Sequence, residues 1–228
     1  MRYIEKGDTP QYITDWIALR KSANQSLDYD EFNQKSKLNE DLRKEQHGLC
    51  CYCQKRIDHF QGDKETGAHN EHLIPQSGSK PDQMNYRNIY ACCIASVGEK
   101  KNSHQQHCGE SKGEKKIRPF IQEENCVAYF RYNSLGEIIP NGKYGRFEEY
   151  EEHIAELSND EKEALACIQT LNLNCLSLKS ERENIYRSFL ESCMKQGTEV
   201  VKNKLYQKLS EPVYPEFIEL LLQIAKKL

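Results

Sequence analysis

The sequence lacks any long hydrophobic run. Of its 228 residues, 29% are charged and 37% are hydrophobic. No stretch approaches the ~18 consecutive apolar residues that indicate a membrane span. Residues 1–21 also lack the apolar centre of a secretory signal peptide, and internal repeats and low-complexity linkers are absent. These absences predict a cytoplasmic protein that has no membrane partner.

An excess of positive charge is missing too, because 32 Lys and Arg residues face 35 Asp and Glu residues. The charges are unevenly distributed. Lys80 to Arg118 carries eight basic against four acidic residues, whereas Phe147 to Glu163 carries one lysine against eight acidic residues. The basic segment favours a phosphate-bearing substrate, with Lys112, Lys115 and Lys116 as candidate nucleic-acid contacts. A solvated lysine-rich loop is the alternative interpretation.

Ten cysteines occur in a chain without a secretory signal, so we expect metal ligands rather than disulfide bonds. Two pairs have suitable spacing, Cys50-x2-Cys53 and Cys93-x14-Cys108. Two pairs of thiolates complete the tetrahedron of a zinc ion, and an ion with four protein ligands is structural. The second pair is less regular, and Cys92 competes with Cys93. The isolated cysteines are interpreted as ordinary half-buried thiols: Cys126, Cys167, Cys175 and Cys193.

Glu71 and His72 stand between the two cysteine pairs and are followed by Pro75. A histidine with an ordinary pKa of ~6.5 suits a base that removes a proton from water at neutral pH. A glutamate is a hard oxygen donor that suits Mg²⁺ or Mn²⁺. Metal-assisted hydrolysis of a phosphodiester needs both groups. A lone histidine is more often a surface or core residue, so the position between the cysteine pairs singles out His72.

The hydrophobic spacing predicts a mixture of helices and short strands. Gly48 is expected to end the second helix, and residues 88–93 are expected to begin another. The apolar face of the last helix is interpreted as core packing, with docking onto a partner protein as the alternative. Extended segments are predicted at 71–74 and, as a β-hairpin, at 127–132 and 138–139. Further helices are predicted over residues 16–23, 29–46, 158–170, 178–196 and 215–228.

The candidate site resembles HNH, or ββα-metal, endonucleases. The matching pieces are Cys50-x2-Cys53, Glu71-His72-x2-Pro75, Asn88-x4-Cys93 and Cys108-x3-Lys112-Gly113. Softer similarity to the PtuB family of HNH proteins lies in residues 1–6 with Pro10, residues 46–53, and residues 171–174 with Arg182. PtuB proteins belong to Septu-type antiphage systems, some of them attached to retrons. The similarity covers most of the chain, and the HNH core is its specific part.

The resemblance implies a role for each matching residue. His72 would be the general base, Glu71 a ligand of the catalytic Mg²⁺ or Mn²⁺ ion, and Asn88 a brace for the loop that carries His72. The structural zinc would be held by Cys50, Cys53, Cys93 and Cys108. The spacing from Asn88 favours Cys93 over Cys92.

One position departs from the HNH pattern. Many HNH enzymes have an asparagine or histidine metal ligand directly after the last cysteine, where this chain has Gly109. His107 is expected to replace it as a ligand of the catalytic ion, with His104 as the alternative.

The resemblance also implies an organisation and partners. We expect an α+β chain with an N-terminal helical arm (1–46), a zinc-stabilised ββα-metal core (47–120), a β-hairpin (121–145) and a C-terminal helical region (146–228) that contacts a partner. The implied partners are a PtuA-like ATPase, a DNA or tRNA substrate, and in a retron system a reverse transcriptase with its msDNA. The alternative is a catalytically decayed, zinc-stabilised module that binds nucleic acid or protein.

Overall fold

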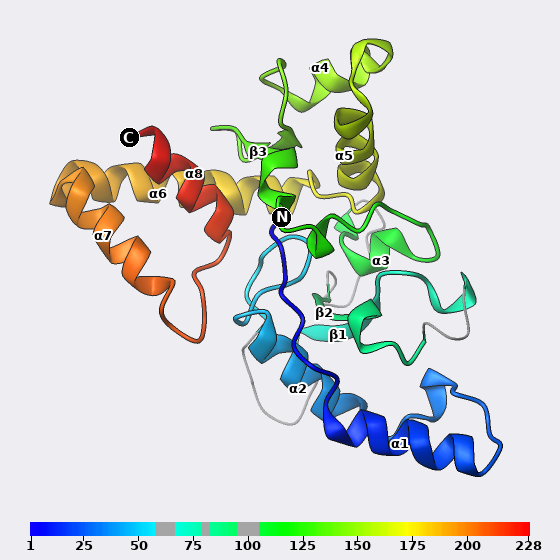
Figure 1. Ribbon diagram of the computed structural model, residues 1–228. Coiled ribbons are helices and arrows are strands. Elements are labelled where there is room, and N and C mark those ends of the chain that lie inside the picture. Colours follow the sequence, from blue (N-terminus) through cyan, green and yellow to red (C-terminus); the bar gives the residue numbers. More distant parts are fainter. Residues whose placement is uncertain (58–66, 79–82, 95–104) are drawn as a thin grey trace.

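A computed structural model describes residues 1–57, 67–78, 83–94 and 105–228 of the chain (Figure 1). The architecture is α+β, as predicted, with helices around two small antiparallel sheets. None of the described helices combines the length and the apolarity needed to cross a membrane. The strands are β1 (Ala68–His72) paired with β2 (Ile89–Cys93), and β3 (Phe130–Tyr132) paired with β4 (Ile138–Pro140). The helices are α1 (Gln11–Ser22), α2 (Lys35–Glu45), α3 (Gly109–Lys112), α4 (Phe147–Glu152), α5 (Asn159–Thr170), α6 (Leu176–Gln196), α7 (Thr198–Lys208) and α8 (Ile218–Lys227).

The β1–β2 pair lies beside α2 and carries most of the candidate site residues (Figure 1). The register pairs Ala68 with Cys93 at one end and His72 with Ile89 at the other. The prediction of a helix over 88–93 is therefore wrong. All five residues of β2 are buried, and a short, wholly apolar run has the same hydrophobic pattern in a buried strand as in a buried helix.

Both N-terminal helices begin at other residues than predicted. Helix α1, expected over 16–23, begins already at Gln11. The helix expected over 29–46 begins only at Lys35, because the Asp28 side chain accepts from Asp30 N–H and starts a separate 3₁₀ turn. Phe32 then has extended backbone. Gly48 follows α2 with a φ of 74°, as expected for the residue that ends a helix, and its N–H donates to Arg43 O at 2.8 Å.

The C-terminal region contains the predicted helices, and two more helices, α4 and α7, lie outside the predicted ranges. Ser158 and Glu161 form the expected capping box at the start of α5. Helix α7 was missed, and it packs with α6 and α8. The apolar face of α8 is turned inward: Leu221 and Ile224 are buried, and α8 contacts β3 and α6. This face is therefore core, and the alternative of partner docking is not supported.

One hydrophobic core connects the four predicted segments. The largest buried cluster includes Met1, Cys50, Phe130 and Leu178, which come one from each segment. A second, smaller cluster joins Ile139 on β4 to α4 and α5. The segments are thus parts of a continuous packing arrangement, and the candidate site is held from several sides.

Candidate active site and metal centre

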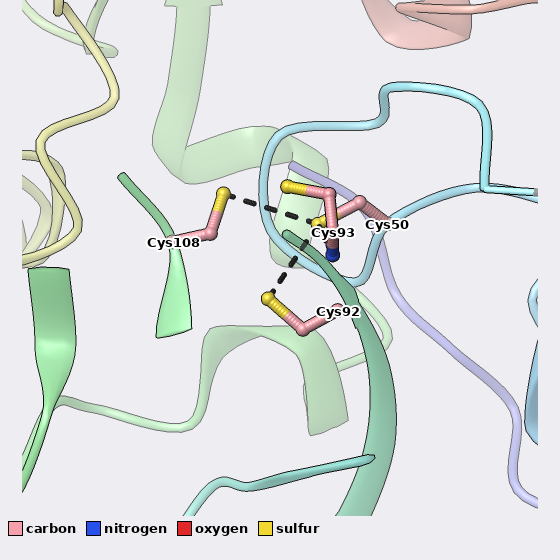
Figure 2. A group of neighbouring side chains, drawn as sticks. All are labelled: Cys50, Cys92, Cys93 and Cys108. Atoms are coloured by element: carbon pink, nitrogen blue, oxygen red, sulfur yellow. Dashed lines mark hydrogen bonds between the residues drawn. The ribbon is translucent and has the colours of Figure 1, made fainter. Parts of the chain in front are cut away.

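A cluster of thiols is assembled from three places in the chain (Figure 2). Cys50 and Cys53 lie on a tight turn that is closed by a bridge between Leu49 and Arg56. Cys92 and Cys93 are the last residues of β2, and Cys108 directly precedes α3. All five cysteines are buried, so the cluster is shielded from solvent on every side.

The donor atoms form two overlapping groups of four. Within each group all donor atoms lie within 4.8 Å of one another, and Cys93 and Cys108 belong to both groups. Neighbouring sulfurs lie 3.9 Å apart for Cys50 with Cys92 and with Cys108, and 3.6 Å apart for Cys53 with Cys93. Four sulfurs bound to zinc at ~2.3 Å stand ~3.8 Å from each other, so these distances suit a tetrahedral ion. The groups are Cys50, Cys92, Cys93 and Cys108, and Cys53, Cys93, His107 and Cys108.

Backbone amides also favour negative charge on the sulfurs. Cys93 N–H donates to Cys50 Sγ at 3.4 Å, and Gly109 N–H donates to Cys92 Sγ at 3.3 Å. Burial alone would raise the pKa of Cys50, but the hydrogen bonds from neighbouring thiols outweigh burial and lower this pKa. Burial raises the pKa of Cys53, Cys92 and Cys108, so these thiols would lose their protons as an ion binds. Thiolates bind metals, and a buried group of four sulfurs has the chemistry of a structural zinc site.

His107 lies among these thiols. Its Nε2 is 3.6 Å from Cys93 Sγ, while Nδ1 lies 3.0 Å from Gln105 O. A histidine that binds a metal through one ring nitrogen usually donates its other N–H to a carbonyl, and His107 has this arrangement. No contact among the described residues joins it to Glu71. The prediction that His107 binds the catalytic ion is therefore corrected: its position makes it a candidate zinc ligand. His104, the alternative, lies outside the described residues.

The Glu71 carboxylate is largely buried next to Gly109. Its Oε1 accepts from Tyr52 OH at 3.2 Å and lies 2.8 Å from Lys112 Nζ. Its Oε2 lies 3.4 Å from His69 Nε2. Burial would raise the pKa of Glu71, but the hydrogen bond from His69 and the charge of Lys112 outweigh burial and lower it. The carboxylate is therefore charged and oriented.

Lys112 does not have the position of a nucleic-acid contact. Its side chain is only 2% exposed, and its ammonium group donates to His72 O at 2.8 Å as well as pairing with Glu71. The prediction for Lys112 is corrected accordingly, because a buried and paired ammonium cannot reach a phosphate on the surface. Lys115 and Lys116 are exposed and stay available for that role.

His69 is a site residue that the sequence analysis missed. It lies two residues before Glu71 in β1, and alternate residues of a strand point to the same face. A Cβ atom on Gly109 would lie 2.7 Å from His69 Nε2 and 2.5 Å from Glu71 Oε2. The missing side chain at Gly109 thus leaves room for both donor atoms. The alternation of β1 is the signal that could have identified His69.

His72 is held on the other face of β1. Its Nε2 donates to Gln83 O at 2.9 Å, and its Nδ1 accepts from the Gln76 amide at 3.1 Å. The Tyr29 ring packs edge-on with its centroid 4.6 Å away. Burial lowers the pKa of His72 below its usual value. The imidazole is therefore neutral at pH 7, as a base must be before it accepts a proton.

Asn88 braces the turn that follows His72. Its Oδ1 accepts from Ile74 N–H at 2.7 Å, and its Nδ2 donates to Ile74 O at 3.0 Å. A side-chain amide that occupies both polar groups of one residue fixes the backbone of that residue. This contact supports the bracing role that the resemblance implied.

The assembled residues offer two kinds of metal chemistry. The buried sulfurs form a soft site with no open position, whereas Glu71 and His69 offer an oxygen and a nitrogen donor near the surface. Neither a protein-family model nor a curated protein matches the sequence. Any functional assignment therefore depends on the residues and their geometry.

Proposed function

We propose that the chain is a metal-dependent endonuclease of the HNH type, which hydrolyses phosphodiester bonds of nucleic acid. The observation that carries the proposal is the placement of Glu71 and His72 at the end of β1. One is a charged, oriented carboxylate and the other is a neutral, oriented imidazole. The chain order of β1, β2 and α3 around them also agrees with a ββα-metal core.

The two side chains leave β1 on opposite faces, as adjacent residues of a strand do. Glu71 contacts Tyr52 and Lys112, whereas His72 contacts Gln76 and Tyr29. In-line displacement at phosphorus requires the nucleophile and the leaving oxygen on opposite sides of the phosphate. The proposal therefore requires the phosphate to bind at the end of β1, where the metal ion and the base would approach it from opposite sides.

Each residue would have its own role in the reaction. A divalent ion bound at Glu71 would polarise the scissile phosphate and offset charge on the leaving oxygen. His72 would take a proton from the attacking water through Nδ1, the nitrogen that is not bonded to the Gln83 carbonyl. The Gln76 amide must first move away from Nδ1. Lys112 would keep the Glu71 carboxylate in its orientation.

The thiol cluster would hold a structural zinc ion. Cys108 leads directly into α3, and Cys93 ends β2, so an ion bound by both would fix the two elements together. Zinc binding supplies folding free energy in small sites of this kind. The zinc would therefore maintain the active site without taking part in the reaction.

We further propose that the substrate is DNA or tRNA and that an ATPase partner controls cleavage, as the resemblance to Septu and retron systems implies. In a retron system a reverse transcriptase and its msDNA would join the complex. Lys115 and Lys116 are exposed beside the site and offer contacts to phosphate. Hydrolysis by water needs no 2′-hydroxyl group, so the mechanism suits both substrates.

A second candidate is a zinc-stabilised binding module that has lost catalysis. One observation favours it: the Lys112 ammonium already neutralises Glu71 at 2.8 Å. A permanent ion pair at this position would compete with a divalent cation for the carboxylate.

Cleavage of supercoiled plasmid DNA and of tRNA by the purified chain separates the two candidates. The nuclease proposal predicts products with Mn²⁺ or Mg²⁺, none with EDTA, and none from a Glu71→Ala protein that still holds zinc. Binding of either nucleic acid without cleavage under all metal conditions, alone and with the ATPase, would favour the binding module.

A further inference from the structure

We infer that His69 and Glu71 together form the site for the catalytic divalent cation, on the face of β1 that is turned toward Gly109. This inference rests on the proposed function, because it names the second ligand of the same ion. His69 thereby takes the role that the HNH pattern gives to the residue after the last cysteine.

The two donor atoms already converge. His69 Nε2 and Glu71 Oε2 lie 3.4 Å apart and form a long, weak hydrogen bond. The distance is comparable to the ~3 Å between neighbouring ligands of an octahedral ion bound at ~2.1 Å. Both residues come from one strand, so little conformational entropy is lost when they bind the same ion.

The two oxygens of Glu71 have separate partners. Oε1 is occupied by Tyr52 and Lys112, at 3.2 Å and 2.8 Å. Oε2 faces His69 and Gly109. Lys112 and Tyr52 therefore orient the carboxylate through one oxygen and leave the other for the cation. Orientation of a ligand by such outer contacts typically strengthens metal binding.

Gly109 provides the space for the cation. Any side chain there would begin with a Cβ atom 2.5 Å from Glu71 Oε2 and 2.7 Å from His69 Nε2, so these two side chains would have to move out of their present positions. The hydrogen bond from Gly109 N–H to Cys92 Sγ keeps this backbone in place. Glycine at this position is thus not a lost ligand, because it makes room for two ligands from β1.

The site is open to an ion from solvent. The His69 side chain is 34% exposed, whereas that of Glu71 is 10% exposed. An imidazole is a softer ligand than water or a carboxylate, so the pair should prefer Mn²⁺ to Mg²⁺.

Titration of Mn²⁺ into the zinc-loaded full chain, followed by the electron paramagnetic resonance signal of free Mn²⁺, tests the assignment. His69→Ala and Glu71→Ala should each weaken Mn²⁺ binding by about tenfold or more, the effect of losing even an outer-sphere partner. Zinc content should stay unchanged in both. His153→Ala, which removes an imidazole from the end of α4, is the matched control and should bind Mn²⁺ as the unmodified protein does.

Gly109→Asn gives an independent test, because it restores the residue type of the HNH pattern. The inference predicts weaker Mn²⁺ binding with zinc retained, whereas tighter binding would show that the ligand belongs at position 109. Unchanged Mn²⁺ affinity in His69→Ala together with weak binding in Glu71→Ala would overturn the inference and leave the proposed function intact. Unchanged Mn²⁺ affinity in both variants would show that the ion does not bind at β1. This result would contradict both the inference and the proposed function.

Discussion

Glu71 shows how three neighbours set the properties of one side chain. Tyr52 and Lys112 fix the orientation of the carboxylate, and His69 lies at its second oxygen. Together with the small residue Gly109, these contacts keep a negative charge in a largely buried position. The two candidate functions differ in whether Oε2 of this carboxylate binds a cation while Oε1 keeps its ion pair with Lys112.

Single cysteine substitutions can identify the zinc ligands. Cys93 and Cys108 belong to both possible groups of four, so Cys93→Ser and Cys108→Ser should each lose the zinc and unfold at a lower temperature. Cys51→Ser is the matched control, because Cys51 is equally buried but belongs to neither group. Zinc content by elemental analysis should be about one per chain in the control.

Two further variants distinguish the groups. Loss of zinc in Cys92→Ser but not in Cys53→Ser would assign the ion to the group with Cys50, and the reverse would assign it to the group with His107. Full zinc retention in Cys93→Ser would contradict a zinc site at this cluster.

Most residues of the candidate site could be identified from the sequence, but the contacts between them could not. Spacing singled out Glu71 and four of the five clustered cysteines, but Cys50 and Cys53 fall in different groups of four, and Cys92, which the spacing disfavoured, belongs to one of them. Spacing could not show that His107 Nε2 lies 3.6 Å from Cys93 Sγ, because this contact depends on the folded path of the chain between the two residues. His69 was missed because its role depends on the face of β1 that it shares with Glu71.

At the scale of elements, the β1–β2 hairpin depends on one amide side chain. Asn88 is buried and bonds both polar backbone groups of Ile74. Asn88→Ala leaves these groups without their partner and should lower the free energy of unfolding by about 1–3 kcal/mol. Chemical unfolding measures this directly. Asn85→Ala, which removes an exposed amide from the adjacent turn, should cost less, and an equal loss would contradict the bracing role.

Features of secondary structure that depend only on residues close in sequence were predicted correctly. The capping box of α5 and the glycine after α2 depend only on nearby residues, and both were found. The strand β2 was mistaken for a helix because its five residues are all buried, so its partner strand decides its conformation. Helix α7 has no side-chain cap and follows α6 after Gly197 alone, which explains why it was missed.

Across the whole molecule, Arg182 joins parts that are distant in sequence. This side chain on α6 is 1% exposed and donates to Gly136 O in the β3–β4 turn and to Leu173 O, each at 2.6 Å. Gly136 has a φ of 71°, and a Cβ there would lie 2.1 Å from Lys179 O, so the turn can approach α6 only as glycine. The charged side chain and the small turn together dock the hairpin onto the C-terminal region.

Replacement of Arg182 by methionine should lower the free energy of unfolding by about 2–4 kcal/mol, because buried carbonyls lose a charged donor. Thermal or chemical unfolding is the measurement. Arg187→Met on the exposed side of the same helix is the control and should change stability by less than about 0.5 kcal/mol. Similar losses in both variants would show that α6 is not anchored through Arg182.

The most direct test of His72 as the general base is the rate of metal-dependent cleavage by a His72→Gln protein, which keeps a hydrogen-bonding side chain of similar size. The proposed mechanism predicts a rate about 10²–10⁴-fold lower, the usual effect of losing a general base. Zinc content, unfolding temperature and Mn²⁺ affinity should match those of the unmodified protein, and His153→Ala should cleave normally. Cleavage at the unmodified rate by folded, zinc-containing His72→Gln protein would contradict the proposed mechanism.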